Sequence, residues 1–141
     1  MITSSHRRRR WVLPVTALAA VLIFGVGATF YLLPRDLTVS GTLELASVRD
    51  VDTSGTSCRG TGGFGDIREG AQVVVTDPAG ATLALGSLGV GVAKAASACV
   101  FPLAVTVPAG RKIYGVEVSH HGRVQYEESA LSVPLKLELG P

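Results

Sequence analysis

The residues of this chain that could do chemistry gather in two short segments. In the first, Ser119, His120 and His121 are adjacent, and a serine with a histidine is the minimum from which a nucleophile and its general base can be built. A triad is assembled in space, so adjacency along the chain is no sign of one. We expect turn residues whose imidazoles respond to pH. A hydrolase would require one of these three to meet a carboxylate in a pocket.

The second segment is glycine-rich. Gly60–Gly65 matches the pattern G-x-G-x-x-G, which in dinucleotide-binding folds lies between a strand and a helix, with an acidic residue about 20 positions on. Here Asp66–Gly70 leads into the strand-like run Val73–Val75 instead. We therefore expect a surface loop and no nucleotide.

Carboxylates border the glycine segment, and carboxylate oxygens are the ligands that calcium prefers. They are Asp50, Asp52, Asp66 and Glu69. Their spacing fits no known calcium loop, so we expect a solvated acidic rim. His120 and His121 cannot easily share a metal, because adjacent side chains on a strand point to opposite faces. The sequence therefore predicts no catalytic residue, no metal and no cofactor.

The two cysteines of the chain, Cys58 and Cys99, are far apart in the sequence. A redox-active pair would more often be C-x-x-C, and zinc needs more than two ligands. An even pair in an oxidising compartment indicates a disulfide. A closed loop of about 40 residues would stabilise the fold by roughly 4 kcal/mol in the chain-entropy model. We expect it to pin the glycine- and serine-rich loop 53–65 to the strand that begins at Val100.

An apolar segment at the N-terminus determines where this chemistry takes place. Trp11–Leu33 contains no charged residue and directly follows Arg7–Arg10. As a helix it would be roughly 34 Å long, enough for a hydrocarbon core of about 30 Å. The positive-inside rule places residues 1–10 in the cytoplasm and residues 34–141 outside. The sequence predicts a single-pass protein of the cell membrane, with the lipid bilayer as its first partner.

A cleaved signal peptide is the alternative, and Val26-Gly27-Ala28 would fit its cleavage site. The apolar run is longer than a usual signal core and continues to Leu33, which favours a retained anchor. The arginines are explained by orientation and by anionic lipid. The chain has 13 Lys+Arg, of which Arg7–Arg10 precede the anchor, against 11 Asp+Glu, so residues 34–141 are near charge balance. No nucleic-acid partner is expected.

The exported part shows the alternation of apolar and polar residues that is typical of half-buried strands, first at Leu37, Val39, Leu43 and Leu45. Strands are predicted at 37–45, 73–75, 82–85, 100–107, 113–119, 123–127 and 133–139. Segments 53–65 and 92–98 are expected to be loops. The prediction is an all-β fold, an immunoglobulin-like antiparallel β-sandwich of about seven strands, preceded by one transmembrane α-helix.

Phe64 is the one aromatic residue of the exported part that no strand pattern places. Phe101, Tyr114 and Tyr126 lie on predicted strands and are expected in the core. An exposed Phe64 in the glycine loop would be a contact residue for a partner. The candidate contact loop comprises Arg59, Gly62, Gly63, Phe64 and Asp66.

The spacing of the cysteines and glycines resembles that of a group of actinobacterial exported proteins without an assigned activity. The matching residues are Cys58-x-Gly60-x-Gly62-Gly63-Phe64-x-Asp66-Ile67-x-x-Gly70, Val73-x-Val75-x-Asp77-x-x-Gly80, Cys99-Val100-Phe101-Pro102, Val107-Pro108 and Tyr114-x-Val116-x-Val118. The resemblance implies that the paired cysteines and the glycine loop belong together. It also implies a short anchor or a lipoprotein signal before the domain. This chain lacks a cysteine that could be lipidated, so a transmembrane anchor would replace lipidation.

The plan of the chain is similar to that of the small mycobacterial membrane proteins that accompany lipid-exporting transporters. We therefore expect a non-enzymatic envelope protein whose outer domain contacts another envelope or membrane protein. The alternative is an extracytoplasmic carrier of a lipid, which would need a sizeable apolar cavity.

Overall fold

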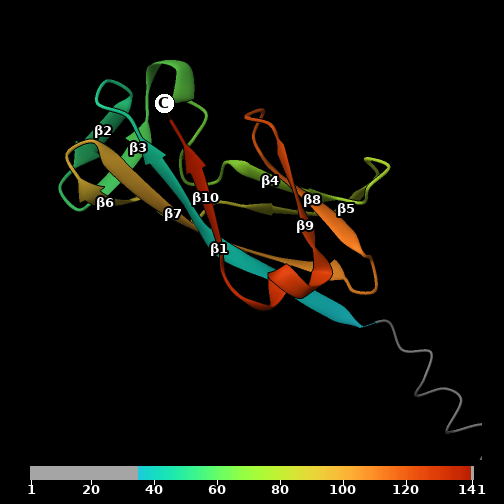
Figure 1. The fold of residues 1–141 in the computed structure, drawn as a ribbon. Helices are drawn as coiled ribbons and strands as arrows, with labels where there is room; N and C mark the ends of the chain where they lie inside the picture. Colours follow the sequence, from blue (N-terminus) through green and yellow to red (C-terminus); the bar gives the residue numbers. More distant parts are fainter. Residues whose placement is uncertain (1–34, 141) are drawn as a thin grey trace, which may run out of the picture. The chain divides into compact units, whose positions relative to one another are not determined.

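The computed structural model describes residues 35–140, which form ten strands in two sheets packed as a β-sandwich-like fold (Figure 1). The strands are β1 (Asp36–Ala46), β2 (Val51–Ser54), β3 (Ser57–Gly60), β4 (Gln72–Thr76), β5 (Thr82–Ser87), β6 (Val92–Ala95), β7 (Ala98–Pro108), β8 (Ile113–Val118), β9 (Arg123–Glu127) and β10 (Leu135–Leu139). Two 3₁₀ turns, η1 (Gly62–Phe64) and η2 (Glu128–Ser132), interrupt them. The prediction of an all-β domain is confirmed.

Residues 35–140 contain no helix that is long and apolar enough to span a membrane. The predicted anchor Trp11–Leu33, the basic tail 1–10 and the alternative cleavage site after Ala28 lie outside the described residues.

The six-stranded sheet has the order β10-β1-β7-β6-β3-β2. Its centre is the long antiparallel pair of β1 and β7, which runs from Asp36 opposite Pro108 to Ala46 opposite Ala98. On its other side β1 pairs with β10 in parallel. The alternation read from the sequence of β1 matches this arrangement, because Val39, Leu43 and Leu45 are buried.

The four-stranded sheet has the order β5-β4-β8-β9. The core lies between the two sheets. It includes Val73 and Val75 of β4, Val116 of β8, and Phe101 and Val105 of β7. Valine dominates these positions because β-branched side chains pack well on a pleated surface.

Each of the seven predicted strands is found, and three further strands were missed. β2, β3 and β6 have four residues each; β3 and β6 lie in the two segments predicted to be loops, and β2 overlaps the start of the first. Most of their side chains are exposed, so the sequence shows no apolar alternation there. The last strand is shorter than predicted. It begins at Leu135, and Val133 lies outside it with 62% of its surface exposed.

A glycine allows the last strand to pack closely on the first. Gly41 of β1 lies directly opposite Leu135 of β10. A Cβ atom at Gly41 would overlap the backbone carbonyl of Leu135. Any larger residue at Gly41 would therefore push β10 away from the sheet.

The domain has two distinct ends, separated by the length of β1, which is roughly 35 Å. The start of β1 and the turn after β7 lie at one end. The turn 47–50, the segment 61–67 and the β8–β9 turn gather at the other end, where Thr61 N–H donates to the carbonyl of Asp50. The glycine segment and the histidine pair are therefore placed at the same end of the domain.

Candidate functional site

The two segments singled out in the sequence meet in the structure. His121 Nε2 lies 2.9 Å from Asp66 Oδ1, although 55 residues separate them in the chain. The ring of Phe64 stacks on the imidazole of His121, with ring centroids 5.2 Å apart and an interplanar angle of 23°. Phe64 and Asp66 are thus brought together with His121 at one cluster, which we call the brace.

Backbone hydrogen bonds fold the glycine segment back on itself. Gly60 N–H donates to the carbonyl of Ile67, and Ile67 N–H donates to the carbonyl of Phe64. The side chain of Ile67 is fully buried in the core. Gly60 is required here, because a Cβ at this position would overlap the carbonyl oxygen of Phe64. The segment is therefore a compact turn anchored on Ile67, where the sequence suggested an open loop.

An unusual backbone conformation orients the histidine. Ser119 has a φ of 50°, the single non-glycine residue of the described chain with a positive φ. Its N–H donates to the carbonyl of Gln72, and His121 N–H donates to the carbonyl of Val118. This left-handed residue turns the chain so that His121 faces Asp66. Nothing in the sequence marks the position, since serine rarely adopts a positive φ.

Several groups act on the carboxylate of Asp66. Partial burial acts to raise its pKa. Hydrogen bonds from His121, from its own backbone and from the Ser119 hydroxyl, together with the charge of His121, outweigh this effect and hold the pKa of Asp66 below its ordinary value. The carboxylate therefore remains ionised and acts as the centre of the brace.

This geometry bears on the hydrolase alternative. A histidine does meet a carboxylate, at the end of a groove described below. Among the described residues, however, no hydrogen bond joins the Ser119 hydroxyl to His121, and this hydroxyl acts instead on Asp66, where it helps to lower the pKa of the carboxyl. In a catalytic triad the histidine lies between the serine and the acid. The three groups thus match a structural clamp on Asp66 better than an activated nucleophile. His120 is exposed.

Three of the four acidic residues around the glycine segment, Asp50, Asp52 and Asp66, have separate partners. Asp50 accepts a hydrogen bond from Ser47 Oγ at 2.8 Å. Asp52 forms an ion pair with Arg59 at 3.1 Å. Within residues 35–140, no three His, Cys, Asp or Glu side chains lie close enough together to hold a metal ion.

The remaining members of the predicted contact loop occupy the surface. Arg59 is on β3 and lines a polar hollow of about 540 Å³ together with Arg68 and Glu69. Gly62 has a φ of 55°, and a Cβ there would overlap the carboxylate of Asp50. Gly63 is exposed and has open space around it. Arg59 thus lies apart from the brace, whereas Phe64 is half-buried in it.

The predicted disulfide is present. Cys58 of β3 and Cys99 of β7 are bonded, with their Cα atoms 5.8 Å apart. The bond passes beside Gly91, where a Cβ atom would lie 2.8 Å from the sulfur of Cys99. The disulfide therefore holds the β2–β3 hairpin against the long strand β7.

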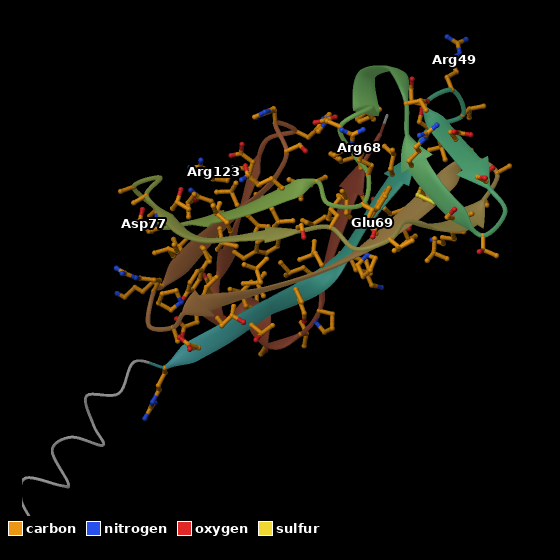
Figure 2. The ribbon with its side chains drawn as sticks, turned by 180° about the vertical axis from the view of Figure 1, so that it is seen from behind. Arg49, Arg68, Glu69, Asp77 and Arg123 are labelled. Carbon is orange, nitrogen blue, oxygen red and sulfur yellow. A yellow bond between two sulfur atoms is a disulfide. The ribbon has the colours of Figure 1, made fainter. Side chains whose placement is uncertain are left out.

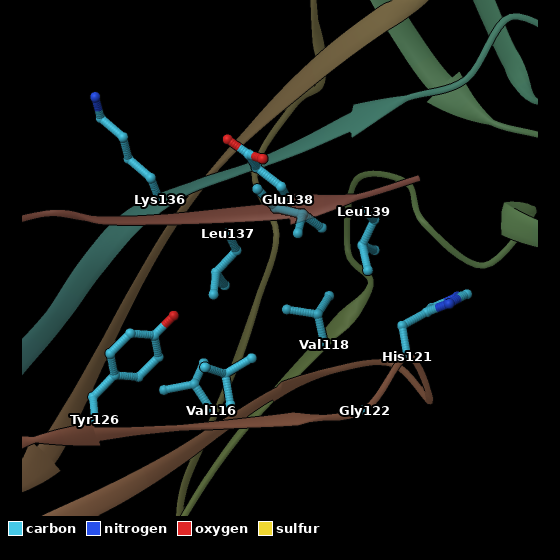
Figure 3. A pocket seen from close by; sticks show the side chains of 11 residues that line it. Val116, Val118, His121, Gly122, Tyr126, Lys136, Leu137, Glu138 and Leu139 are labelled. Atoms are coloured by element: carbon cyan, nitrogen blue, oxygen red, sulfur yellow. The ribbon is translucent and has the colours of Figure 1, made fainter. Parts of the chain in front are cut away.

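An apolar groove beside the brace was missed in the sequence. It lies between β10 and the β8–β9 hairpin and has a volume of about 300 Å³ (Figure 3). Leu137 and Leu139 of β10 form one wall together with Lys136 and Glu138, the valines Val116 and Val118 and the ring of Tyr126 form the other, and His121 lies at one end. No local pattern could reveal the groove, because it exists where the last strands of two different sheets diverge.

No family model matches the chain, and neither a curated protein nor a solved structure matches it. The resemblance to actinobacterial exported proteins stays a prediction.

Proposed function

We propose that this chain is a single-pass membrane protein of the cell envelope whose outer β-domain binds another envelope or membrane protein, without catalytic activity. The brace carries this proposal, since it fixes Phe64 and Asp66, two members of the contact loop suggested by the sequence. The charge-free run Trp11–Leu33 after Arg7–Arg10 supports the anchor.

A surface that is ordered before binding loses little entropy when a partner arrives. The brace, the buried Ile67 and the disulfide give segment 61–67 this order. Around it lie exposed groups of mixed character, including Val48 with 90% of its surface exposed, Arg49 and Arg68. Figure 2 shows Arg49 and Arg68 towards this end of the domain and Asp77 at the opposite end. A surface that combines charged side chains with an exposed apolar side chain such as Val48 favours a protein partner.

A lipid carrier is the second candidate, and the apolar groove favours it. Its volume of about 300 Å³ is at the lower limit of small-molecule sites, which span roughly 300–1,000 Å³. The groove would hold part of one acyl chain. We rank this function second for that reason.

We also propose that the fold is immunoglobulin-like. The parallel pairing of the first and last strands supports this class. So does Tyr114, whose hydroxyl donates to the carbonyl of Pro108 six residues upstream, as in the tyrosine corner of such domains. The disulfide differs, because it joins strands of one sheet instead of bridging the two sheets as in antibody domains.

Site-specific photo-crosslinking in the native membrane tests the proposed function. A photoreactive residue at Gly63 meets no neighbour within 4 Å and samples the contact surface. The same residue at exposed Ala79, in the β4–β5 turn at the other end of the domain, is the matched control. We expect one reproducible envelope protein captured from Gly63 and not from Ala79. Co-purification of this protein should be lost in Gly63→Arg and kept in Ala79→Arg.

Two results would contradict the proposal. Equal capture from both positions would show that the surface around Gly63 has no special role. Association that survives scrambling of Thr61–Asp66 in a folded domain would show the same.

The membrane anchor and the second candidate have tests of their own. Recovery of the intact N-terminal peptide by mass spectrometry would support the anchor, whereas a mature chain that starts near Thr29 would overturn it. Lipid that stays bound in native mass spectrometry would favour the second candidate.

A further inference from the structure

The strands β10 and β9 each form one edge of a sheet. Among the described residues, β10 pairs with β1 alone and β9 pairs with β8 alone. Both strands therefore present a row of backbone N–H and C=O groups without strand partners, one on each side of the apolar groove. Such edges invite pairing with another strand.

The groove beside these edges exposes apolar side chains. Leu137 is nearly buried, with 8% of its surface exposed, but Leu139 and Tyr126 are only partly covered. Val124 of β9 has 49% of its surface exposed. A further strand laid along β10 would cover these side chains and pair with the open backbone groups of β10.

We propose that the strand is β10 of a second copy of this chain, paired antiparallel to β10 in a symmetric dimer. β10 alternates leucine at 135, 137 and 139 with Lys136 and Glu138 between them. Figure 3 shows Leu137 and Leu139 on the side of β10 that faces the β8–β9 hairpin, and Lys136 and Glu138 on the other side of the strand, although all four residues line the groove. A symmetric pair centred on Leu137 would set Lys136 of each copy opposite Glu138 of the other, and the leucines of both copies on the groove side.

The charges select this register. Symmetric pairs centred on Lys136 or on Glu138 would also keep the leucines inward, but they would place like charges opposite each other. Cross-strand pairs of opposite charge stabilise a sheet and like pairs destabilise it. The pairing centred on Leu137 is therefore the favoured one of the three.

The charges of β10 also have no ion-pair partner in one copy. Neither Lys136 nor Glu138 forms an ion pair with another described residue. Glu138 lies beside Glu44 of β1 in the parallel register, and Glu44 itself is paired with Lys94 at 2.8 Å. Lys136 of a second copy would bring a positive charge to the open side of Glu138. This complementarity distinguishes a second copy from an acyl chain, which would leave both charges unmatched.

Energy transfer between labelled copies of the full chain in lipid vesicles tests the dimer. The vesicles contain phosphatidylethanolamine and phosphatidylglycerol, and the protein is diluted by added lipid. Each copy carries a donor or an acceptor dye on a cysteine introduced at Thr82, an exposed residue of β5. We expect Lys136→Glu and Glu138→Lys, each alone, to weaken the dimer by about tenfold because two opposite pairs become two like pairs. The double exchange Lys136→Glu with Glu138→Lys should restore it to near the original strength.

Rescue by the double exchange would exclude misfolding as the cause of the loss. Energy transfer that is absent at every dilution, or that is unchanged by both single reversals, would overturn the proposal. Uptake of a fluorescent fatty acid by a chain that stays monomeric would overturn it in favour of a lipid in the groove. The result is independent of the partner captured at Gly63, because the contact surface and the β10 edge are tested by different substitutions.

Discussion

Replacing Tyr114 by phenylalanine removes a single oxygen from the most enclosed polar contact of the domain. The side chain is fully buried. Its hydroxyl lies 3.0 Å from both the Pro108 carbonyl and the Glu128 carboxylate, which share its single proton, and it accepts from Arg111 N–H at 3.2 Å. Glu128 also accepts from Gly110 N–H at 2.8 Å. The hydroxyl therefore links the turn between β7 and β8 to η2.

The expected loss follows from these contacts. A neutral hydrogen bond contributes about 1 kcal/mol and one to a charged group about 1.5–3 kcal/mol, but water can replace the hydroxyl at the exposed Arg111. We expect Tyr114→Phe to lower the free energy of unfolding by about 2 kcal/mol. In a domain of this size this lowers the Tm by roughly 10 °C.

Thermal unfolding of the full chain in detergent, followed by near-ultraviolet circular dichroism, measures this shift. Tyr126→Phe is the matched control, because the Tyr126 hydroxyl makes no hydrogen bond to another described residue and its side chain is half-exposed. The control should shift the Tm by less than about 3 °C. Equal shifts in the two variants would refute the stabilising role of the Tyr114 hydroxyl.

The pH dependence provides a second readout. Burial raises the pKa of Tyr114 above its ordinary value of 10.0; the Arg111 N–H opposes this, and the hydrogen bond to Glu128 and its charge add to it. A phenol whose pKa is higher in the folded state contributes its stability in full below pH 10, and this stability is lost as the pH rises through the folded pKa. The difference in unfolding free energy between wild type and Tyr114→Phe should therefore narrow above pH 10. A constant difference would contradict this reasoning.

Further outcomes can be measured in the same unfolding assay. Reduction of Cys58–Cys99, which closes a loop with a sequence separation of 41, should cost about 4 kcal/mol; a loss below about 1 kcal/mol would contradict the loop-closure estimate. Thr76→Val should raise the free energy of unfolding by about 1 kcal/mol, because Thr76 is 1% exposed and its Oγ1 has no hydrogen-bond partner within the described chain; a lower Tm would exclude this explanation. The depressed pKa of Asp66 means that its contribution is full above its unfolded pKa near 3.8 and is lost as the pH falls through the folded value. As the pH falls below about 4, the free energy of unfolding of Asp66→Asn should therefore decrease less than that of the wild type. An identical decrease in the two proteins would argue against the contact of Asp66 with His121.

The sequence predicts the parts of this fold that rest on local apolar patterns. The long strands β1 and β7 were identifiable because their buried residues alternate over eleven positions each. β2 and β6 carry mostly exposed side chains, so no apolar pattern marks them, although each pairs with the strand that follows it in the chain. The disulfide itself was predictable from the pair of cysteines and from the expectation that residues 34–141 lie in an oxidising compartment.

The candidate site was predictable as two separate segments, but not as one cluster. The contact of Asp66 with His121 depends on the left-handed backbone of Ser119, for which serine is an uncommon choice. It also depends on the buried Ile67, whose role cannot be inferred from one apolar residue in a glycine-rich segment. The groove could be predicted only from knowledge of which strands form the edges of the two sheets.

The parallel pairing of β1 with β10 has a consequence for the biogenesis of the protein. Gly41, near the start of the domain, finds its neighbour Leu135 only when nearly the whole chain has been synthesised. Contacts between such distant segments slow folding, since most of the chain must be ordered to close the sheet. If the domain is exported as we propose, the sheet would close only after Leu135 has emerged on the far side of the membrane. A chain cut off before β10 would leave one edge of β1 without its strand partner, although its other edge could still pair with β7.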